Sequence, residues 1–136
     1  MKFFVLFVSL ILNLFLTGAA LAQYDDVQWR TYVREALAKG RVVELLNELE
    51  AEAATAEKAN RWNHVSFIFA EASSAARING QLQKGLTYAQ RSLEAAEKAK
   101  DPWLRPQALG RLINALQSLG KQSEVREWIL KGIEIV

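Results

Sequence analysis

Apolar and polar residues follow one another along the chain with the spacing of amphipathic helices. One apolar stripe runs through Leu82, Leu86, Ala89, Leu93 and Ala96, whose steps of four, three, four and three residues place them on one helical face. Similar stripes precede each of three glycines, and no stretch alternates strictly enough to predict a strand. The pattern predicts an all-α protein of three helix pairs, over 26–38 and 42–58, 63–78 and 82–99, and 102–118 and 122–135.

Gly40, Gly80 and Gly120 divide the chain with a period of 40 residues. The word "AEKA" repeats with the same period, at 56–59 and 96–99, so each helix pair is one repeat. A glycine after the first helix of a pair supplies the left-handed residue that closes the helix. Repeats that stack on their neighbours bury apolar residues that an isolated pair leaves exposed.

The start of the fifth helix has its own signal in Asp101 and Pro102. Aspartate caps the free amides of a helix, and proline has the backbone angle of the first helical position. Three of the four tryptophans fall at or near predicted helix starts, and we expect most of the four to pack in the core and between repeats. These tryptophans are Trp29, Trp62, Trp103 and Trp128.

The segment "PQALGRLINALQSLGKQSEVREWILKGIEI" resembles a tetratricopeptide repeat of the longer-spaced kind, and the resemblance covers nearly all of 26–136. The family's small residue in the second helix is matched by Gly85, whereas Leu45 and Val125 stand there in the other repeats, and Glu52 stands at a usual alanine. The resemblance implies three stacked antiparallel helix pairs in a right-handed solenoid. The family's packing positions in the first helices are matched by Trp29, Phe69 and Leu109, by Tyr32, Ala72 and Leu112, and by Ala36, Ala76 and Leu116.

Residues 1–22 have the features of a secretory signal peptide. Lys2 precedes an apolar run over 3–16, and the small residues Ala20 and Ala22 stand three and one positions before a cut that leaves Gln23 first. The alternative is an uncleaved anchor, which would be the protein's only membrane contact. Residues 23–136 then form one domain outside the cytoplasm, and the absence of cysteine and of N-glycosylation sequons favours the periplasm of a bacterial envelope over another secreted location.

Charge and motifs argue against nucleic acid and nucleotide binding. The chain has 17 Lys+Arg and 15 Asp+Glu, a net charge of +2, which lacks the clustered positive excess of nucleic-acid-binding proteins. Gly80 and Gly85 have the spacing of a phosphate-binding loop, but Leu86 stands where that loop needs lysine. We expect no cofactor.

Candidate catalytic groups are few. His64 is the single histidine, and we expect a helix cap or surface residue there because the residues near it in sequence form no catalytic or metal-binding set. Glu44, Glu48 and Glu52 step by four along one helix, which is typical of a solvated face. The sequence therefore predicts no catalytic residue and no metal ligand, and a protein that is not an enzyme.

The first helices of tetratricopeptide stacks line an inner groove, and the 40-residue register selects the residues that would line it here. Small members of the set, such as Ala70 and Gly110, leave room; Asn114 can hold an extended peptide backbone, and arginines can bind a carboxylate through two hydrogen bonds. The expected partner is an extended or acidic protein segment; the alternative is a merely solvated surface. The predicted groove residues are Arg30, Arg34, Ser74, Arg77, Asn114 and Gln117.

The last predicted helix carries more apolar residues than one stripe needs. Clustered apolar residues at the end of a stack favour association with a second copy or another protein, although single exposed apolar residues are common. We therefore expect an exported binding adaptor or assembly subunit of the cell envelope. The alternatives are a self-associating structural subunit with an idle groove and a small envelope enzyme. The predicted association residues are Trp128, Leu130, Ile133, Ile135 and Val136.

Overall fold

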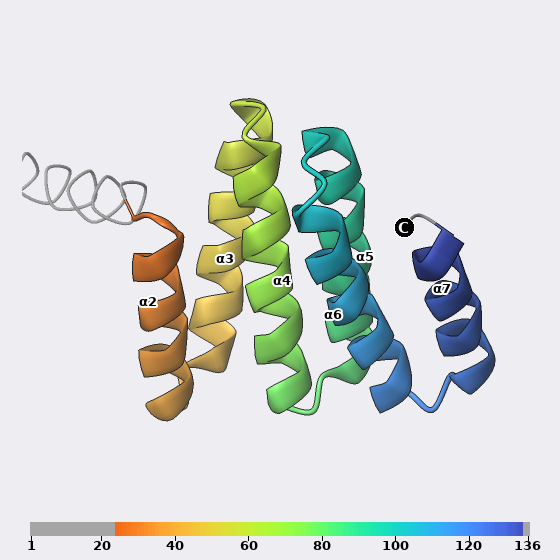
Figure 1. Ribbon diagram of the computed structural model, residues 1–136. Helices are drawn as coiled ribbons and strands as arrows, with labels where there is room; N and C mark the ends of the chain where they lie inside the picture. Colours follow the sequence, from red (N-terminus) through yellow and green to blue (C-terminus); the bar gives the residue numbers. More distant parts are fainter. Residues whose placement is uncertain (1–23, 135–136) are drawn as a thin grey trace, which may run out of the picture.

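The computed structural model describes residues 24–134, and the regular structure within them is entirely helical (Figure 1). This confirms the predicted all-α class, and the bounds differ from the predicted ones by at most two residues. The predicted signal peptide, Ile135 and Val136 lie outside the described residues. The six helices are α2 Asp26–Ala38, α3 Val42–Lys58, α4 Trp62–Ile78, α5 Leu82–Ala99, α6 Leu104–Ser118 and α7 Gln122–Glu134.

The three period-marking glycines close α2, α4 and α6. Gly40, Gly80 and Gly120 have φ of 71°, 77° and 71°, in the left-handed region that a side chain would disfavour. The amide after each glycine bonds back into the last helical turn, as that of Gln81 does to the Ala76 carbonyl at 2.8 Å. The predicted role of the glycines is therefore confirmed.

The predicted start of the fifth helix is wrong by two residues, because α6 begins at Leu104. Asp101 accepts a hydrogen bond from the Trp103 amide at 2.9 Å, and the Leu104 amide bonds to the Asp101 carbonyl at 3.2 Å. Pro102 therefore lies in a turn before the helix. Trp103 is 80% exposed, whereas Trp29, Trp62 and Trp128 pack in or against the core clusters, as expected of most of the four tryptophans.

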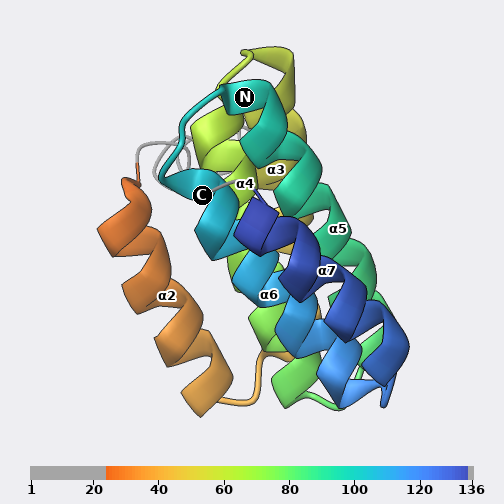
Figure 2. The ribbon, with the colours of Figure 1, turned by 45° about the vertical axis from the view of Figure 1, so that its right-hand side comes forward.

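Each helix packs against the next one along the chain. The chain reverses direction at each short turn between two helices (Figure 1). The first helices of successive pairs also meet, since α2 contacts α4 and α4 contacts α6. Figure 2 shows α2, α4 and α6 on one side of the row and α5 and α7 on the other. Among the described residues, no helix is long and apolar enough to cross a bilayer.

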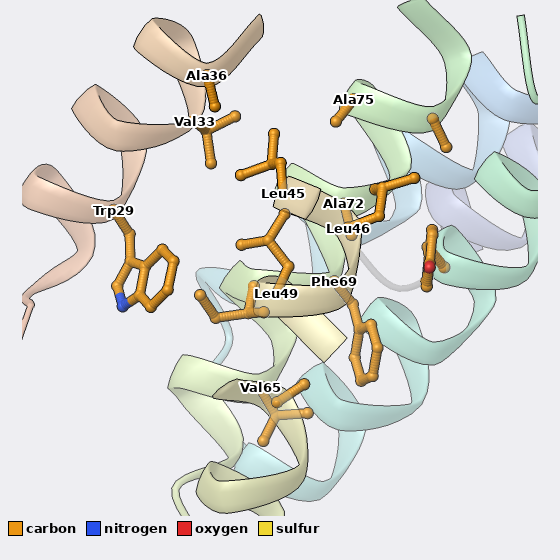
Figure 3. Packing of buried hydrophobic residues seen from close by; sticks show 14 of the residues in the cluster. Trp29, Val33, Ala36, Leu45, Leu46, Leu49, Val65, Phe69, Ala72 and Ala75 are labelled. Atoms are coloured by element: carbon orange, nitrogen blue, oxygen red, sulfur yellow. The ribbon is translucent and has the colours of Figure 1, made fainter. Parts of the chain in front are cut away.

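A first core cluster lies between α2, α3, α4 and the inner face of α5. Trp29 of α2 points toward Leu45 and Leu49 of α3, and Phe69 of α4 lies beside them (Figure 3). Trp29, Leu45 and Phe69 are each 1% exposed. Leu45 thus fills the core beside Trp29.

A second cluster lies between α5, α6 and α7. Leu86 and Leu93 of α5 meet Leu112 and Leu116 of α6, and Val125 joins them from α7. Because Tyr88 and Ala95 of α5 belong to the first cluster, α5 is apolar on two faces and links the two halves of the core. Fully burying a large apolar side chain stabilises a fold by about 1.5–3 kcal/mol. Because α5 buries side chains in both clusters, the stability of each cluster depends on the other, and the three helix pairs are coupled.

Small residues bring α4 and α5 close together. Ser66 and Ser92 each donate a side-chain hydrogen bond to the other's backbone carbonyl, at 2.9 and 2.8 Å. Ser73 donates to the Gly85 carbonyl at 2.7 Å. A Cβ atom on Gly85 would come within 3.2 Å of the Ser73 carbonyl oxygen. The lack of a side chain at Gly85 therefore allows α4 and α5 to approach closely, as the sequence predicted.

Candidate functional site

A cavity of about 500 Å³ opens between the three first helices of the pairs. Polar side chains enter it from α2 and α6, and one aromatic ring comes from α4. Its size falls in the range of ligand-binding clefts. Its lining includes Asp26 and Arg30 of α2, Phe67, Ala70 and Glu71 of α4, and Gly110, Arg111 and Asn114 of α6.

Two of the six predicted groove residues, Arg30 and Asn114, line this cavity, together with Ala70 and Gly110 from the same register positions. The other four lie outside its lining. Arg34 and Gln117 are exposed on α2 and α6, Ser74 is half-buried, and Arg77 donates to the Ser118 hydroxyl at 3.4 Å. The structure thus brings part of the predicted set together.

Arg30 is held in place by two contacts from α4. Its Nε atom lies 3.8 Å from a carboxylate oxygen of Glu71, whose side chain is 11% exposed. The guanidinium carbon lies 5.5 Å from the centre of the Phe67 ring. The Nη groups of Arg30 make no hydrogen bond to the described residues, so they remain as donors for a ligand.

Arg111 is a cavity residue that the sequence interpretation missed. It is half-buried, lines the cavity, and makes no ion pair with a described side chain. The 40-residue period could have indicated it, because Arg111 stands 40 residues after Glu71 and both residues line the cavity. Arg111 is thus a half-buried cation next to Asn114 with no carboxylate partner among the described side chains.

The expectation of a cap or surface role for His64 is wrong. Its side chain is only 12% exposed and bridges two carboxylates, with Nδ1 2.9 Å from Asp26 and Nε2 2.8 Å from Glu52. Each ring nitrogen thus lies within hydrogen-bonding distance of one carboxylate. Since Asp26 lines the cavity, this cluster fixes one edge of it by tying α2 to α3 and α4.

The prediction of a solvated glutamate row is wrong for Glu52. Glu44 is exposed, but Glu48 is half-buried and Glu52 is 7% exposed. Arg61 approaches Glu52 to 3.9 Å and supplements the bond from His64. The buried carboxylate thus has the charged partners that burial requires.

Two tyrosine hydroxyls donate to glutamates across helices. Tyr32 donates to Glu48, and Tyr88 donates to Glu50. Burial raises the pKa of both tyrosines above the ordinary value of 10.0, and the hydrogen bond to the neighbouring glutamate raises the pKa further. Both phenols are therefore protonated donors that brace the helices, and neither is a ready base.

A second cavity, of about 540 Å³, lies where α5, α6 and α7 meet, and none of the predicted groove residues lines it. Its walls are mostly apolar, from Pro102, Pro106 and Leu109 to Gly132. Among residues 24–134, no group of three or more His, Cys, Asp or Glu side chains is arranged to hold a metal ion.

The predicted association surface is only partly exposed. Leu130 and Ile133 are 52% and 66% exposed, and Ile129 joins them at 44%. Trp128 is half-buried against the second core cluster, with the Lys131 ammonium 4.5 Å from its ring centre. Ile135 and Val136 lie outside the described residues.

In comparisons with known proteins, no protein-family model, no curated protein and no solved structure matched the chain.

Proposed function

We propose that the protein is an exported adaptor or assembly subunit of the cell envelope that binds a protein or peptide segment. In this proposal the three helix pairs form a tetratricopeptide-like right-handed solenoid, and the cavity between α2, α4 and α6 is part of its concave groove. The protein recognises its partner without catalysis and without a cofactor.

The observation that carries the proposal is the convergence of Arg30, Arg111 and Asn114 on one cavity beside the small residues Ala70 and Gly110. Two arginines and an amide supply donors of the kind that bind carboxylates and peptide backbone. The small residues leave space for a chain to approach.

The cavity's own acids do not oppose an acidic ligand. Glu71 is paired with Arg30, and Asp26 with His64. Arg111 is unpaired among the described side chains and can accept a ligand carboxylate through two parallel hydrogen bonds. An extended segment with an acidic side chain near Arg111 and its backbone near Asn114 fits this arrangement best.

Selection from random peptides displayed on phage tests the proposal. We expect enriched peptides to be acidic, and the double variant Arg111→Glu with Asn114→Ala to weaken their binding at least about tenfold, the change that 1.4 kcal/mol produces. Arg34→Glu is the matched control, because this exposed arginine of α2 does not line the cavity. Enriched peptides that bind the double variant as well as the unchanged protein would remove the cavity from the account.

The exposed Ile129, Leu130 and Ile133 favour a second function, self-association with an idle groove. Light scattering at micromolar concentration separates this alternative from the first. A strictly monomeric protein that binds the selected peptides would rule it out.

A further inference from the structure

The second helices of the pairs carry one apolar face toward the following pair. On α3 this face is Leu46, Leu49, Ala53 and Ala56, each at most 1% exposed in the cluster that α4 shares. On α5 it is Leu86, Ala89, Leu93 and Ala96, each at most 5% exposed in the cluster that α6 shares. The two sets stand 40 residues apart, so they are the same register positions.

On α7 the same register positions are Arg126, Ile129 and Ile133. Here Ile129 is 44% and Ile133 66% exposed, and α6 is the described helix that α7 mainly packs against. Leu130 adds a further apolar side chain, 52% exposed, at the position where α5 has an exposed glutamine. We call Arg126, Ile129, Leu130 and Ile133 the end surface. It is the counterpart of two faces that the same chain covers with a helix, and Figure 1 shows α7 at the end of the row.

The opposite end of the row has a different character. At the positions where α4 buries Ile68 and Ala75, α2 presents Gln28 and Glu35, which are exposed, although Val27 beside them is an apolar residue that is 70% exposed. An apolar end surface does not match this polar face, because burying unpaired polar groups is costly. A second copy therefore does not extend the row head to tail, and the occupant of the end surface must bring its own apolar face.

We propose that the end surface of α7 is a docking site for an amphipathic helix of a partner protein, lying on α7 as α6 lies on α5. Its apolar residues would be spaced four and three apart, as Ala108, Leu112 and Ala115 are in α6. This inference rests on the proposed role as an adaptor or assembly subunit, and it does not depend on the groove.

Arg126 specifies the charge of that helix. It replaces Leu86 of the covered face on α5, is exposed, and makes no ion pair with a described side chain. Because consecutive helices run in opposite directions, the start of α5 lies beside the end of α6, where Leu116 shares the cluster with Leu86. The partner helix would therefore carry a carboxylate near its C-terminal end, at the place that corresponds to Leu116.

The probe is a fluorescent peptide of residues 102–119, the α6 segment of this chain, carrying Leu116→Glu. We expect the purified protein to bind it, as followed by fluorescence anisotropy. Arg126→Glu should weaken that binding at least about tenfold and should favour the same peptide carrying Leu116→Lys. This reversal distinguishes a charge contact from a general loss of apolar surface.

Ile129→Ser with Ile133→Ser should abolish binding of both peptides. Circular dichroism melting checks that this variant folds, since both side chains are largely exposed. Arg111→Glu should leave peptide binding unchanged, so a failure of the groove proposal is separable from a failure of this one. The proposal would be overturned if the protein did not bind the peptide, or if Arg126→Glu bound it equally well. It would also be overturned if light scattering showed a dimer that the isoleucine variant dissociates, because a second copy would then be the occupant.

Discussion

His64 ties three helices together through side chains that lie far apart in the sequence. Asp26 comes from α2, Glu52 from α3 and His64 from α4. The carboxylate of Glu52 is buried, so its stability depends on the donors that His64 and Arg61 provide. At the scale of single residues, this cluster sets the position of α2 beside the cavity.

We expect His64→Ala to lower the free energy of unfolding by about 1–3 kcal/mol, because the buried Glu52 carboxylate loses its closest partner and keeps only Arg61, at 3.9 Å. Urea unfolding of His64→Ala, Glu52→Ala and the double variant should give a coupling energy of about 0.5–3 kcal/mol. Asp26→Ala is the matched control, since its side chain is 55% exposed and such a pair is worth below about 1 kcal/mol. Additive effects of the two buried substitutions would contradict a direct interaction.

The raised pKa of Tyr88 makes a second residue-level prediction. A raised folded pKa means that folding favours the protonated phenol, so this contribution to stability is complete below about pH 10 and falls as the pH rises above it. Urea unfolding at about pH 8 and about pH 11 should show a smaller alkaline loss of stability for Tyr88→Phe than for the unchanged protein. An equal loss in both proteins would mean that Tyr88 does not take part.

At the scale of helices, the close contact of α4 and α5 depends on Gly85. A Cβ atom there would lie 3.1 Å from Arg77 Cγ and 3.2 Å from the Ser73 carbonyl oxygen. We expect Gly85→Leu to lower the free energy of unfolding by about 1–3 kcal/mol through overpacking.

Gly110→Ala in α6 is the matched control for that substitution. Nothing lies within 4 Å of a Cβ atom built on Gly110. Alanine there should be neutral or stabilising by up to about 1 kcal/mol, because it restricts the unfolded chain. Thermal melting checks both variants, and a Gly85→Leu protein as stable as the unchanged one would disprove the close contact.

The helices were predictable from sequence because their signals are local. Apolar stripes set each helical face, and Gly40, Gly80 and Gly120 set three ends through their positive φ. The start of α6 was misjudged because Asp101 bonds the Trp103 amide, and this turn delays the helix past Pro102. Local signals therefore fix the elements to within a turn.

The candidate site was less predictable, because it depends on contacts between helices. His64 and Asp26 stand 38 residues apart, and no local pattern shows that they meet. The register placed Arg30 and Asn114 at the cavity but also selected Arg34 and Gln117, which lie outside its lining. Periodicity indicates the face of a helix, whereas the tilt between helices decides which residues of that face converge.

At the scale of the whole molecule, the row of helices offers two separate surfaces. The cavity between α2, α4 and α6 is polar and carries the unpaired Arg111, whereas the end surface of α7 is apolar around Arg126. Because different helices build them, one partner can occupy the groove while another covers the end. This arrangement suits the proposed role of an adaptor or assembly subunit.

Recognition in the groove is the central claim, and backbone amide NMR tests it most directly. Titration of the labelled protein with an acidic peptide from the phage selection should shift amide signals around Arg30, Ala70, Arg111 and Asn114, and the Arg111→Glu, Asn114→Ala variant should show none of these shifts. Shifts confined to α7, or none at all at saturating peptide, would contradict the account.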